Sequence, residues 1–350
     1  MNAPADLIRL TQFSHGGGCG CKIAPAVLSE ILAKTPIRGL PKDLIVGIES
    51  SDDAAVYRLN DEQAIVATTD FFTPIVDDPT DFGRIAATNA LSDVYAMGGK
   101  PIFALAIVGM PLDKMPVEVI QKIIAGGESV CAEAGIPVAG GHSIDTLEPI
   151  YGLVALGLVH PKKVKRNDRA REGDVLILGK PLGVGILSAA LKKGKLSAEG
   201  YKRMVEVTTQ LNTPGAALAE MEDVHALTDV TGFGLAGHLL EICRGSKLGA
   251  ELKFDDLPVI PEALEWVKEG TATGASDRNW KGYGYEVRMP AVAPDWKRKL
   301  ISDPQTSGGL LVACAPSAEK RVLEEFGGQG FSQACRIGSM RAGGAVLAVT

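Results

Sequence analysis

Short runs of β-branched and other apolar residues alternate with longer runs at helical spacing along the chain. In the first half, the short runs predict strands over 43–50, 63–69, 102–110, 138–141 and 150–159. The longer runs predict helices over 80–97 and 117–134. Strands follow one another directly at both ends of this order, which differs from the strict alternation of a parallel βαβ sheet. The first half therefore predicts an α+β unit with a mixed or antiparallel sheet.

The helix expected over 80–97 carries polar residues as well as an apolar stripe. Thr80 or Asp81 is a plausible cap at its start. Asn89 and Asp93 are four residues apart, so we expect their side chains on one face of this helix.

The second half repeats this style. Its predicted strands cover 174–179, 225–230, 250–254 and 310–313, followed by two short strands near the C-terminus. Its predicted helices cover 184–193, 202–210, 235–244 and 318–326. We find no fixed short repeat, but both halves are predicted to be α+β units with mixed or antiparallel sheets packed against helices.

Charged residues interrupt the apolar pattern over 161–174, where three lysines and three arginines occur. We interpret this basic run as a solvated linker in preference to a phosphate site. The predicted organisation is a glycine-rich N-terminal segment over 1–42, a first domain over 43–160, a linker over 161–173 and a second α+β domain over 174–350. A chain of 350 residues is long enough for two hydrophobic cores.

Composition and charge narrow the class of protein. The chain has 46% hydrophobic and 22% charged residues and a net charge of −6, so no global basic field would attract nucleic acid or an anionic membrane. Residues 1–6 lack the pattern of a signal peptide, and no apolar run approaches the ~18 residues of a membrane span. Six cysteines are too sparse for a disulfide framework. We expect a cytoplasmic protein.

The segment 14–22 is predicted to be a loop that carries chemistry. Its four glycines disfavour helix and strand. Lys22 follows Cys19 by three residues, close enough to favour the thiolate, which is how a reactive cysteine is built. Two other interpretations stay open: a glycine-rich segment near a terminus is often disordered, and a lone cysteine is often a small buried hydrophobe. We expect the four cysteines after Cys21 to serve packing.

Acidic residues provide the second candidate site. The chain has no glycine-rich phosphate loop of the common kinds, but aspartates lie at or just beyond predicted strand ends or on a helix face. They are Asp52, Asp53, Asp70, Asp93 and Asp229. Carboxylates in this arrangement can bind Mg²⁺, and the ion in turn binds the phosphate oxygens of a nucleotide. Asp70 or Asp229 alone is better explained as a turn or capping residue. Asp53 and Asp93 lie in apolar settings, where an unpaired charge is costly.

Two glycine-containing segments and one histidine are ambiguous. Over 228–234 the plain interpretation is a β–α turn with a threonine cap, although backbone N–H groups there could bind an anion. Gly140-Gly141-His142-Ser143 is a tight turn by default, or a close backbone approach to a ligand. His238, beside leucines, is predicted to be packed in the core.

Seven blocks taken together resemble selenophosphate synthetase, the selenide, water dikinase family, within the wider aminoimidazole-ribonucleotide-synthetase-like superfamily. They are 14–22, 52–56, 68–72, 86–93, 139–145, 228–234 and 303–309. They cover nearly the whole chain in order. The later blocks are shared more weakly across the superfamily, and the block with Cys19 and Lys22 is the one that selects this member.

The resemblance implies an enzyme that converts ATP, selenide and water into selenophosphate, AMP and orthophosphate, as a homodimer of two-domain α+β subunits with several Mg²⁺ ions. Cys19 corresponds to the family's catalytic cysteine or selenocysteine, and Lys22 to its essential lysine. The positions implied for metal binding are Asp53, Asp93 and Asp229. The positions implied for nucleotide binding are Lys22, Ser50, Ser51, Asp52, Asp70, Asp93, Gly141, His142 and Ser143.

Two alternatives remain. Another ATP-dependent enzyme of the superfamily, such as a purine-pathway synthetase or a thiamine-phosphate kinase, would share the aspartates without needing Cys19 and Lys22. A non-catalytic zinc module could use His15, Cys19 and Cys21, but a closed structural zinc site takes four ligands. The sequence leaves the role of 271–294 open.

Overall fold

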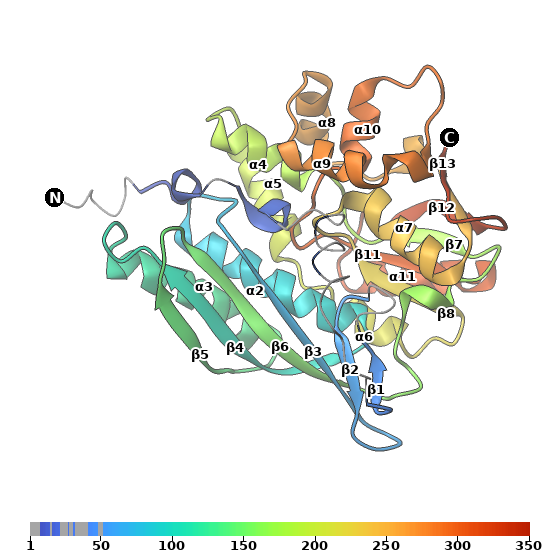
Figure 1. Cartoon of the computed structure of the whole chain (residues 1–350), viewed down its shortest axis with the longest axis horizontal. Coiled ribbons are helices and arrows are strands. Elements are labelled where there is room, and N and C mark those ends of the chain that lie inside the picture. The colour runs from blue at the N-terminus through green and yellow to red at the C-terminus, as the bar shows by residue number, and fades with distance from the viewer. Residues whose placement is uncertain (1–7, 15, 22–26, 28–30, 32–40, 48–51) are drawn as a thin grey trace.

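The protein folds into two α+β units, each with a mixed sheet and its own helices (Figure 1). The structure is a computed structural model, and it describes residues 8–14, 16–21, 27, 31, 41–47 and 52–350. The α+β class and the mixed sheets predicted from the sequence are confirmed. No helix in the described ranges combines the length and apolar character that crossing a membrane requires.

The first sheet has six strands in the order β1-β2-β3-β6-β4-β5. Its strands are β1 (Leu44–Val46), β2 (Ala55–Arg58), β3 (Ala64–Phe72), β4 (Lys100–Met110), β5 (Val138–Asp145) and β6 (Ile150–Val159). Strands β4 and β5 pair in parallel, and the other neighbours pair antiparallel. Helices α2 (Pro79–Ala96) and α3 (Val117–Glu133) cover one face of this sheet (Figure 1). The sequence analysis missed β2.

Helix α2 lies at the junction of the two units. Its cap is Asp78, whose side chain accepts the Asp81 backbone N–H at 2.9 Å, so the cap predicted at Thr80 or Asp81 is wrong by two or three residues. The helix contacts β3 and β6 on one side and α5 and β8 on the other, and its residues from Ile85 to Ala96 are all buried. Polar residues on its second side therefore face the other unit.

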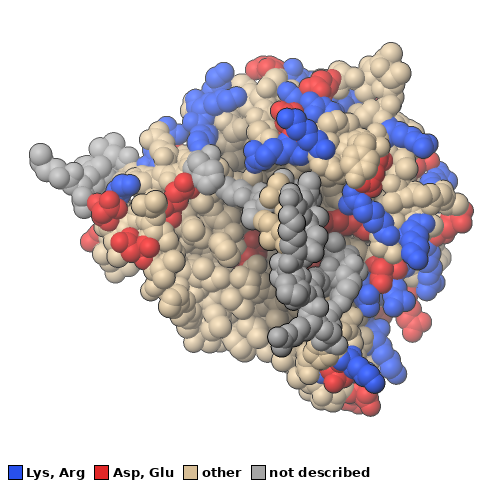
Figure 2. All heavy atoms as spheres, viewed as in Figure 1, with Lys and Arg blue, Asp and Glu red and all other residues tan. Residues whose placement is uncertain are grey.

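The other face of the first sheet is apolar, and no described element covers it in the single chain. Leu105, Ile107, Val154 and Leu156 alternate with the buried residues of β4 and β6 and remain half-exposed. Phe71 of β3 is 49% exposed on the same face. Figure 2 shows that the face over β3, β6, β4 and β5 carries few charged side chains.

Strand β5 corrects a prediction. The strand expected over 138–141 continues to Asp145, so Gly140-Gly141-His142-Ser143 is part of the parallel edge strand rather than a tight turn. Gly141 has φ of 154°, and a Cβ there would meet the Ala106 carbonyl oxygen at 2.0 Å. Gly141 is therefore explained by close pairing with β4, whereas a Cβ at Gly140 would meet only Leu105 Cδ2 at 4.0 Å.

The second sheet has seven strands in the order β10-β13-β9-β12-β7-β11-β8. Its strands are β7 (Val175–Leu178), β8 (Val224–Asp229), β9 (Gly249–Leu252), β10 (Val287–Arg288), β11 (Leu310–Cys314), β12 (Cys335–Arg341) and β13 (Leu347–Val349). Its helices are α4 (Val184–Lys192), α5 (Ala198–Thr209), α6 (Pro214–Leu218), α7 (Gly234–Ser246), α8 (Pro261–Lys268), α9 (Gly274–Tyr283), α10 (Asp295–Ile301) and α11 (Glu319–Gly328). The sequence analysis missed α6, α8, α9 and α10.

The basic segment between the units is more than a solvated linker. Lys165 is 8% exposed, and its ammonium donates to the Met221 and Val224 carbonyl oxygens at 2.9 and 2.6 Å. The short helix η4 (Asn167–Arg169) packs against α7 and β8. A run of charged residues predicts solvent exposure, but Lys165 is buried because its ammonium donates to these two carbonyl oxygens.

Three of the four cysteines expected to serve packing, Cys131, Cys243 and Cys314, are buried. Burial raises the pKa of the Cys131 thiol to about 11, which keeps it protonated. Cys335 is half-buried on β12 and donates to the Asp256 carbonyl oxygen at 3.5 Å.

Candidate active site

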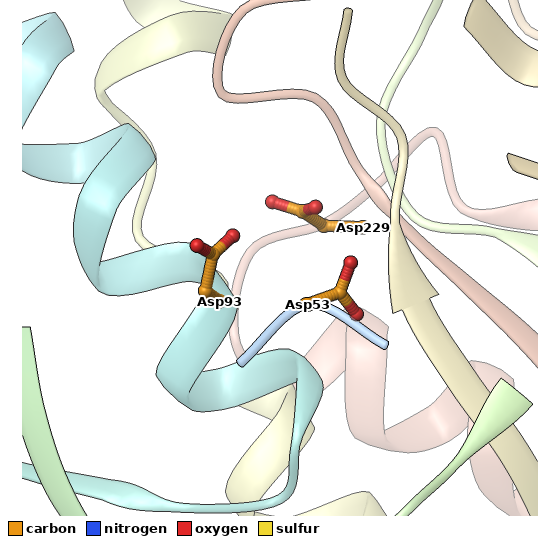
Figure 3. Close-up of side chains that lie close together, drawn as sticks. All are labelled: Asp53, Asp93 and Asp229. Atoms are coloured by element: carbon orange, nitrogen blue, oxygen red, sulfur yellow. The ribbon is translucent and has the colours of Figure 1, made fainter. Parts of the chain in front are cut away.

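Three aspartates from distant parts of the chain meet between the two units (Figure 3). Asp53 lies just before β2, Asp93 is on α2, and Asp229 is the last residue of β8. One carboxylate oxygen from each lies within 4.8 Å of the others. The structure thus brings together the residues that the resemblance implied for metal binding.

A hydroxyl group orients each of these carboxylates. Thr68 donates to Asp93 Oδ2 at 2.5 Å, and Thr228 donates to Asp53 Oδ1 at 2.9 Å. Ser92 donates to Asp229 Oδ2. Donors of this kind fix the direction of a metal ligand and are commonly found behind one.

The cluster concentrates negative charge in a poorly solvated place. Burial holds the pKa of Asp53 well above its usual range, and the neighbouring Asp229 and Asp93 raise it further. Asp53 Oδ2 is buried and has no hydrogen-bond partner among the described residues. The three carboxylates, with the Asp53 Oδ2 acceptor still available, fit Mg²⁺, which binds carboxylate oxygens together with phosphate oxygens and water.

Cys19 joins this site through Asn89. The Cys19 thiol donates to Asn89 Oδ1 at 3.3 Å, and Asn89 Nδ2 donates to Asp70 Oδ2 at 2.6 Å. Asn89 Oδ1 also accepts the backbone N–H of Ser307 at 2.7 Å. One amide side chain on α2 therefore connects the N-terminal loop, strand β3 and the second unit. The sequence placed Asn89 on the same helix face as Asp93 but did not identify it as this connection.

The described part of the N-terminal loop is packed against the rest of the protein. Cys19, in the short helix η3 (Gly18–Cys21), is 1% exposed, and its N–H donates to Thr306 Oγ1 at 3.2 Å. Gly18 has φ of 55°, and a Cβ there would meet Ile75 Cγ2 at 2.3 Å. Arg278 Nη2 of α9 donates to the Gly20 carbonyl oxygen at 3.0 Å. A simply disordered segment is excluded for residues 16–21.

Several predicted nucleotide contacts do not join the cluster in the single chain. Asp52 accepts the backbone N–H of Asn167 at 2.7 Å, so its carboxylate ties the Asp53 loop to η4. Asp70, Leu153, Ala106 and Gly141 form one row across the sheet, with Asp70 and Gly141 at its ends. Three strand spacings separate these ends by roughly 14 Å.

The predicted positions Lys22, Ser50 and Ser51 lie outside the described residues, as does His15 of the zinc alternative.

Comparisons with known proteins agree with the geometry. Two family models match the chain. The model for the N-terminal domain of AIR synthase related protein matches residues 51–159, and the model for its C-terminal domain matches residues 171–349. A protein of Burkholderia ambifaria named selenide, water dikinase is 65% identical to this chain, and the match covers 96% of this chain and 95% of that protein. A protein of the same name from Dechloromonas aromatica is 62% identical, and the match covers 97% of this chain and 98% of that protein. The chain belongs to the selenide, water dikinase family.

Solved structures show the same fold outside this family. A thiamine-monophosphate kinase from Stenotrophomonas maltophilia has a TM-score of 0.65 at 20% identity, covering 94% of this chain and 96% of that protein. The hydrogenase maturation protein HypE of E. coli has a TM-score of 0.62 at 18% identity, covering 83% and 86%. At these identities the likeness establishes the fold alone.

Around the family's Thr228–Gly234 block, the structure corrects one expectation and confirms another. Helix α7 has Phe233 as its N-cap with no side-chain cap, because Thr231 Oγ1 pairs with His238 Nε2 at 3.2 Å instead. His238 is 5% exposed and stacks on Phe233 with ring centroids 5.6 Å apart. The threonine cap is therefore wrong, and the packed core histidine is confirmed.

The polar residues that hydrogen-bond to the three clustered aspartates were not predicted from the sequence. Thr68, Ser92 and Thr228 orient the aspartates, and their closeness in sequence to Asp70, Asp93 and Asp229 was the available signal. Lys180 and Asn212 gave less signal. Asn212 Nδ2 donates to Ser92 Oγ and to the Gly308 carbonyl oxygen at 2.7 and 2.8 Å, which connects two segments distant in the sequence.

Proposed function

We propose that this protein forms selenophosphate from ATP, selenide and water and releases AMP and orthophosphate. The observation that carries the proposal is the path Cys19–Asn89–Asp70 beside the three-aspartate cluster. It places a thiol next to a carboxylate group suited to Mg-ATP, in a chain 62% to 65% identical to proteins named selenide, water dikinase.

Asp53, Asp93 and Asp229 would hold Mg²⁺. When bound, Mg²⁺ neutralises the charge that develops on the phosphoryl oxygens during transfer. The chain's own contribution is to fix the carboxylates with the hydroxyls of Thr68, Ser92 and Thr228 before the nucleotide arrives. Such preorganisation avoids reorientation at the moment of reaction.

Cys19 would handle selenium, and Lys22 would neutralise selenide or phosphate charge. Selenide is a soft anion that is easily oxidised, so a thiol enclosed by a loop suits its delivery. Cys19 is 1% exposed in the present conformation, so the loop must open for selenide to enter. The nucleotide would be contacted by Ser50, Ser51, Asp52 and Asp70.

A homodimer would complete the site. No described element covers the apolar face of β3, β6, β4 and β5 in one chain, and a second copy would bury it. The distance between Asp70 and Gly141 within one chain also supports this assembly, since Gly141, His142 and Ser143 of a second copy can approach the nucleotide when those of the same chain cannot. We propose a cytoplasmic location, because that compartment keeps selenide and thiols such as Cys131 and Cys335 reduced.

The test is the nucleotide product under anaerobic conditions. The purified protein is incubated with Mg-ATP plus selenide, without selenide, or with thiamine phosphate in its place, and AMP and ADP are separated by chromatography. We expect AMP that depends on selenide. Formation of ADP that depends on thiamine phosphate would favour a kinase of the related type and contradict the proposal.

A further inference from the structure

Lys180 is a buried cation that the site described above does not use directly. It follows β7 by two residues and is 1% exposed. Its ammonium donates to the Gln210 and Ser307 carbonyl oxygens at 2.6 and 2.9 Å. Burial lowers the pKa of Lys180 to about 7, while Asp229 acts in the opposite direction. A lysine this deep is costly to bury, so its place needs an explanation.

Ser307 is the residue that Lys180 holds, and it has an unusual backbone. Its φ is 50°, in the left-handed region that residues other than glycine rarely occupy. Its carbonyl oxygen accepts from Lys180, and its N–H donates to Asn89 Oδ1 at 2.7 Å. Both backbone polar groups of this strained residue are therefore fixed by side chains from elsewhere in the chain.

The next residues of the loop leave it little freedom to shift. A Cβ at Gly309 would meet the Lys180 backbone nitrogen at 2.2 Å, and one at Gly308 would meet the Val230 carbonyl oxygen at 2.0 Å. The loop thus runs directly against Lys180 and against the residue that follows Asp229. Releasing the Ser307 carbonyl would change the one part of this loop that touches Asn89.

We propose that Lys180 is a positioning residue for the selenium step, acting through Ser307 and Asn89 on the Cys19 thiol. The ammonium fixes the Ser307 backbone, Ser307 fixes the Asn89 amide oxygen, and that oxygen accepts the Cys19 thiol. The inference rests on the role proposed above for Cys19. The path reaches the thiol, so selenide use is the step expected to change most. The same amide also donates to Asp70, whereas the three clustered aspartates keep their own hydroxyl donors.

Lys165 provides a matched control within the same chain. It is also buried, at 8% exposed, and its ammonium also caps two backbone carbonyls, those of Met221 and Val224. Among the described residues, the hydrogen bonds of the Lys165 ammonium reach neither Cys19 nor the aspartates. Lys165→Met and Lys180→Met therefore remove the same kind of interaction at different places, and a general loss of stability affects both.

The experiment compares the two variants in the full-length protein. Without ATP or selenide, iodoacetamide alkylation of Cys19 is measured by peptide mass spectrometry relative to the half-buried Cys335. Lys180→Met is expected to accelerate Cys19 alkylation severalfold, and Lys165→Met to leave the ratio as in the wild type. In turnover, Lys180→Met is expected to lower kcat for selenide-dependent AMP formation by about 10- to 100-fold, a larger change than in KM for ATP. Equal alkylation ratios in the two variants would overturn the proposal.

A double-variant cycle tests the path itself. Asn89→Ala alone removes this acceptor of the Cys19 thiol, so adding Lys180→Met to it should change Cys19 alkylation no further, whereas an additive change would refute action through Asn89. If Lys180→Met does not fold, Lys180→Gln, which retains one donor, replaces it in both comparisons with the same expected directions. Alkylation needs no assumption about catalysis. If Cys19→Ser retained selenide-dependent turnover, the role of Cys19 would fail while the alkylation data still decided the role of Lys180.

Discussion

Cys19 donates its thiol hydrogen to the amide oxygen of Asn89 at 3.3 Å. This contact turns a glycine-rich segment near the N-terminus into part of a site built mainly from α2, β3 and β8. It also means that a change at the thiol can be separated from a change at the aspartate cluster, because the thiol donates to Asn89 while the clustered aspartates accept from threonine and serine hydroxyls.

Cys19→Ser is expected to abolish selenophosphate formation while leaving ATP binding nearly intact. Serine retains a donor for Asn89 Oδ1, so the loop keeps its hydrogen bond and only the soft nucleophile is lost. Product formation and nucleotide affinity are measured side by side, with Cys335→Ser as the control because Cys335 lies on β12, outside the site. Loss of ATP binding in Cys19→Ser would contradict a role confined to selenium.

Asp53→Asn is expected to weaken Mg-ATP binding and to raise Tm in the absence of Mg²⁺. The substitution removes a ligand oxygen, and it also removes one of three carboxylates that repel one another. Calorimetric titration with Mg-ATP and thermal unfolding with and without Mg²⁺ check both effects. Asp113→Asn, at an exposed carboxylate, is the control. An unchanged affinity for Mg-ATP would remove Asp53 from the site.

Thr228→Val is expected to raise KM for Mg-ATP by about 10-fold, because Asp53 Oδ1 loses the hydroxyl that orients it. Valine nearly keeps the shape of threonine. Thr208→Val is the control, since Thr208 is equally buried but its hydroxyl bonds to the Met204 carbonyl within α5. Steady-state kinetics in Mg-ATP distinguish the variants. Equal KM values in the two would argue against an orienting role for Thr228.

Asp303 predicts a dependence of stability on pH. Burial raises its pKa from 3.8 to about 8, although Ile186 N–H and Gln305 donate to the carboxyl group. Between these values the folded protein keeps a proton that the unfolded chain releases, so the free energy of unfolding falls as pH rises towards about 8. Asp303→Asn removes this contribution.

The measurement is Tm of the wild type and Asp303→Asn at several pH values across that window. The wild type should lose more Tm than the variant as pH rises. Parallel curves for the two proteins would show that Asp303 does not bind the extra proton.

Ile107→Lys is expected to convert a homodimer into a monomer. Ile107 lies on the uncovered face of the first sheet, where a lysine would have to be buried without a partner on dimerisation. Sedimentation velocity gives the mass of each variant. Val292→Lys, at a residue 94% exposed in the second unit, should leave the mass unchanged. A wild type that sediments as a monomer would contradict the proposed assembly.

The sequence was most informative where one physical signal dominates. Apolar periodicity predicted α2 and β3 because packing follows that period. It missed α9, whose buried polar residues pair with backbone: Asn279 donates to the Gly232 and Ser302 carbonyls at 2.9 and 3.1 Å. Strand β5 was cut short because glycines disfavour strands unless a close neighbour requires them.

The candidate site divides in a similar way. Aspartates in apolar surroundings indicated that Asp53 and Asp93 needed a counter-charge, which is a local argument. That Asp229 meets them depends on the docking of two units. The sequence placed this residue among the acidic candidates at strand ends, but alone it was better explained as a turn or capping residue, and the metal role came from the resemblance to a family. The link from Cys19 to Asn89 joins residues seventy positions apart, and no periodicity reports such a contact.

Anaerobic phosphorus NMR of the purified protein with Mg-ATP, recorded with and without selenide, tests the central claim most directly. The account predicts a selenophosphate resonance that grows only with selenide, together with AMP and orthophosphate. ATP that stays intact, or that gives only ADP whether or not selenide is present, would contradict it.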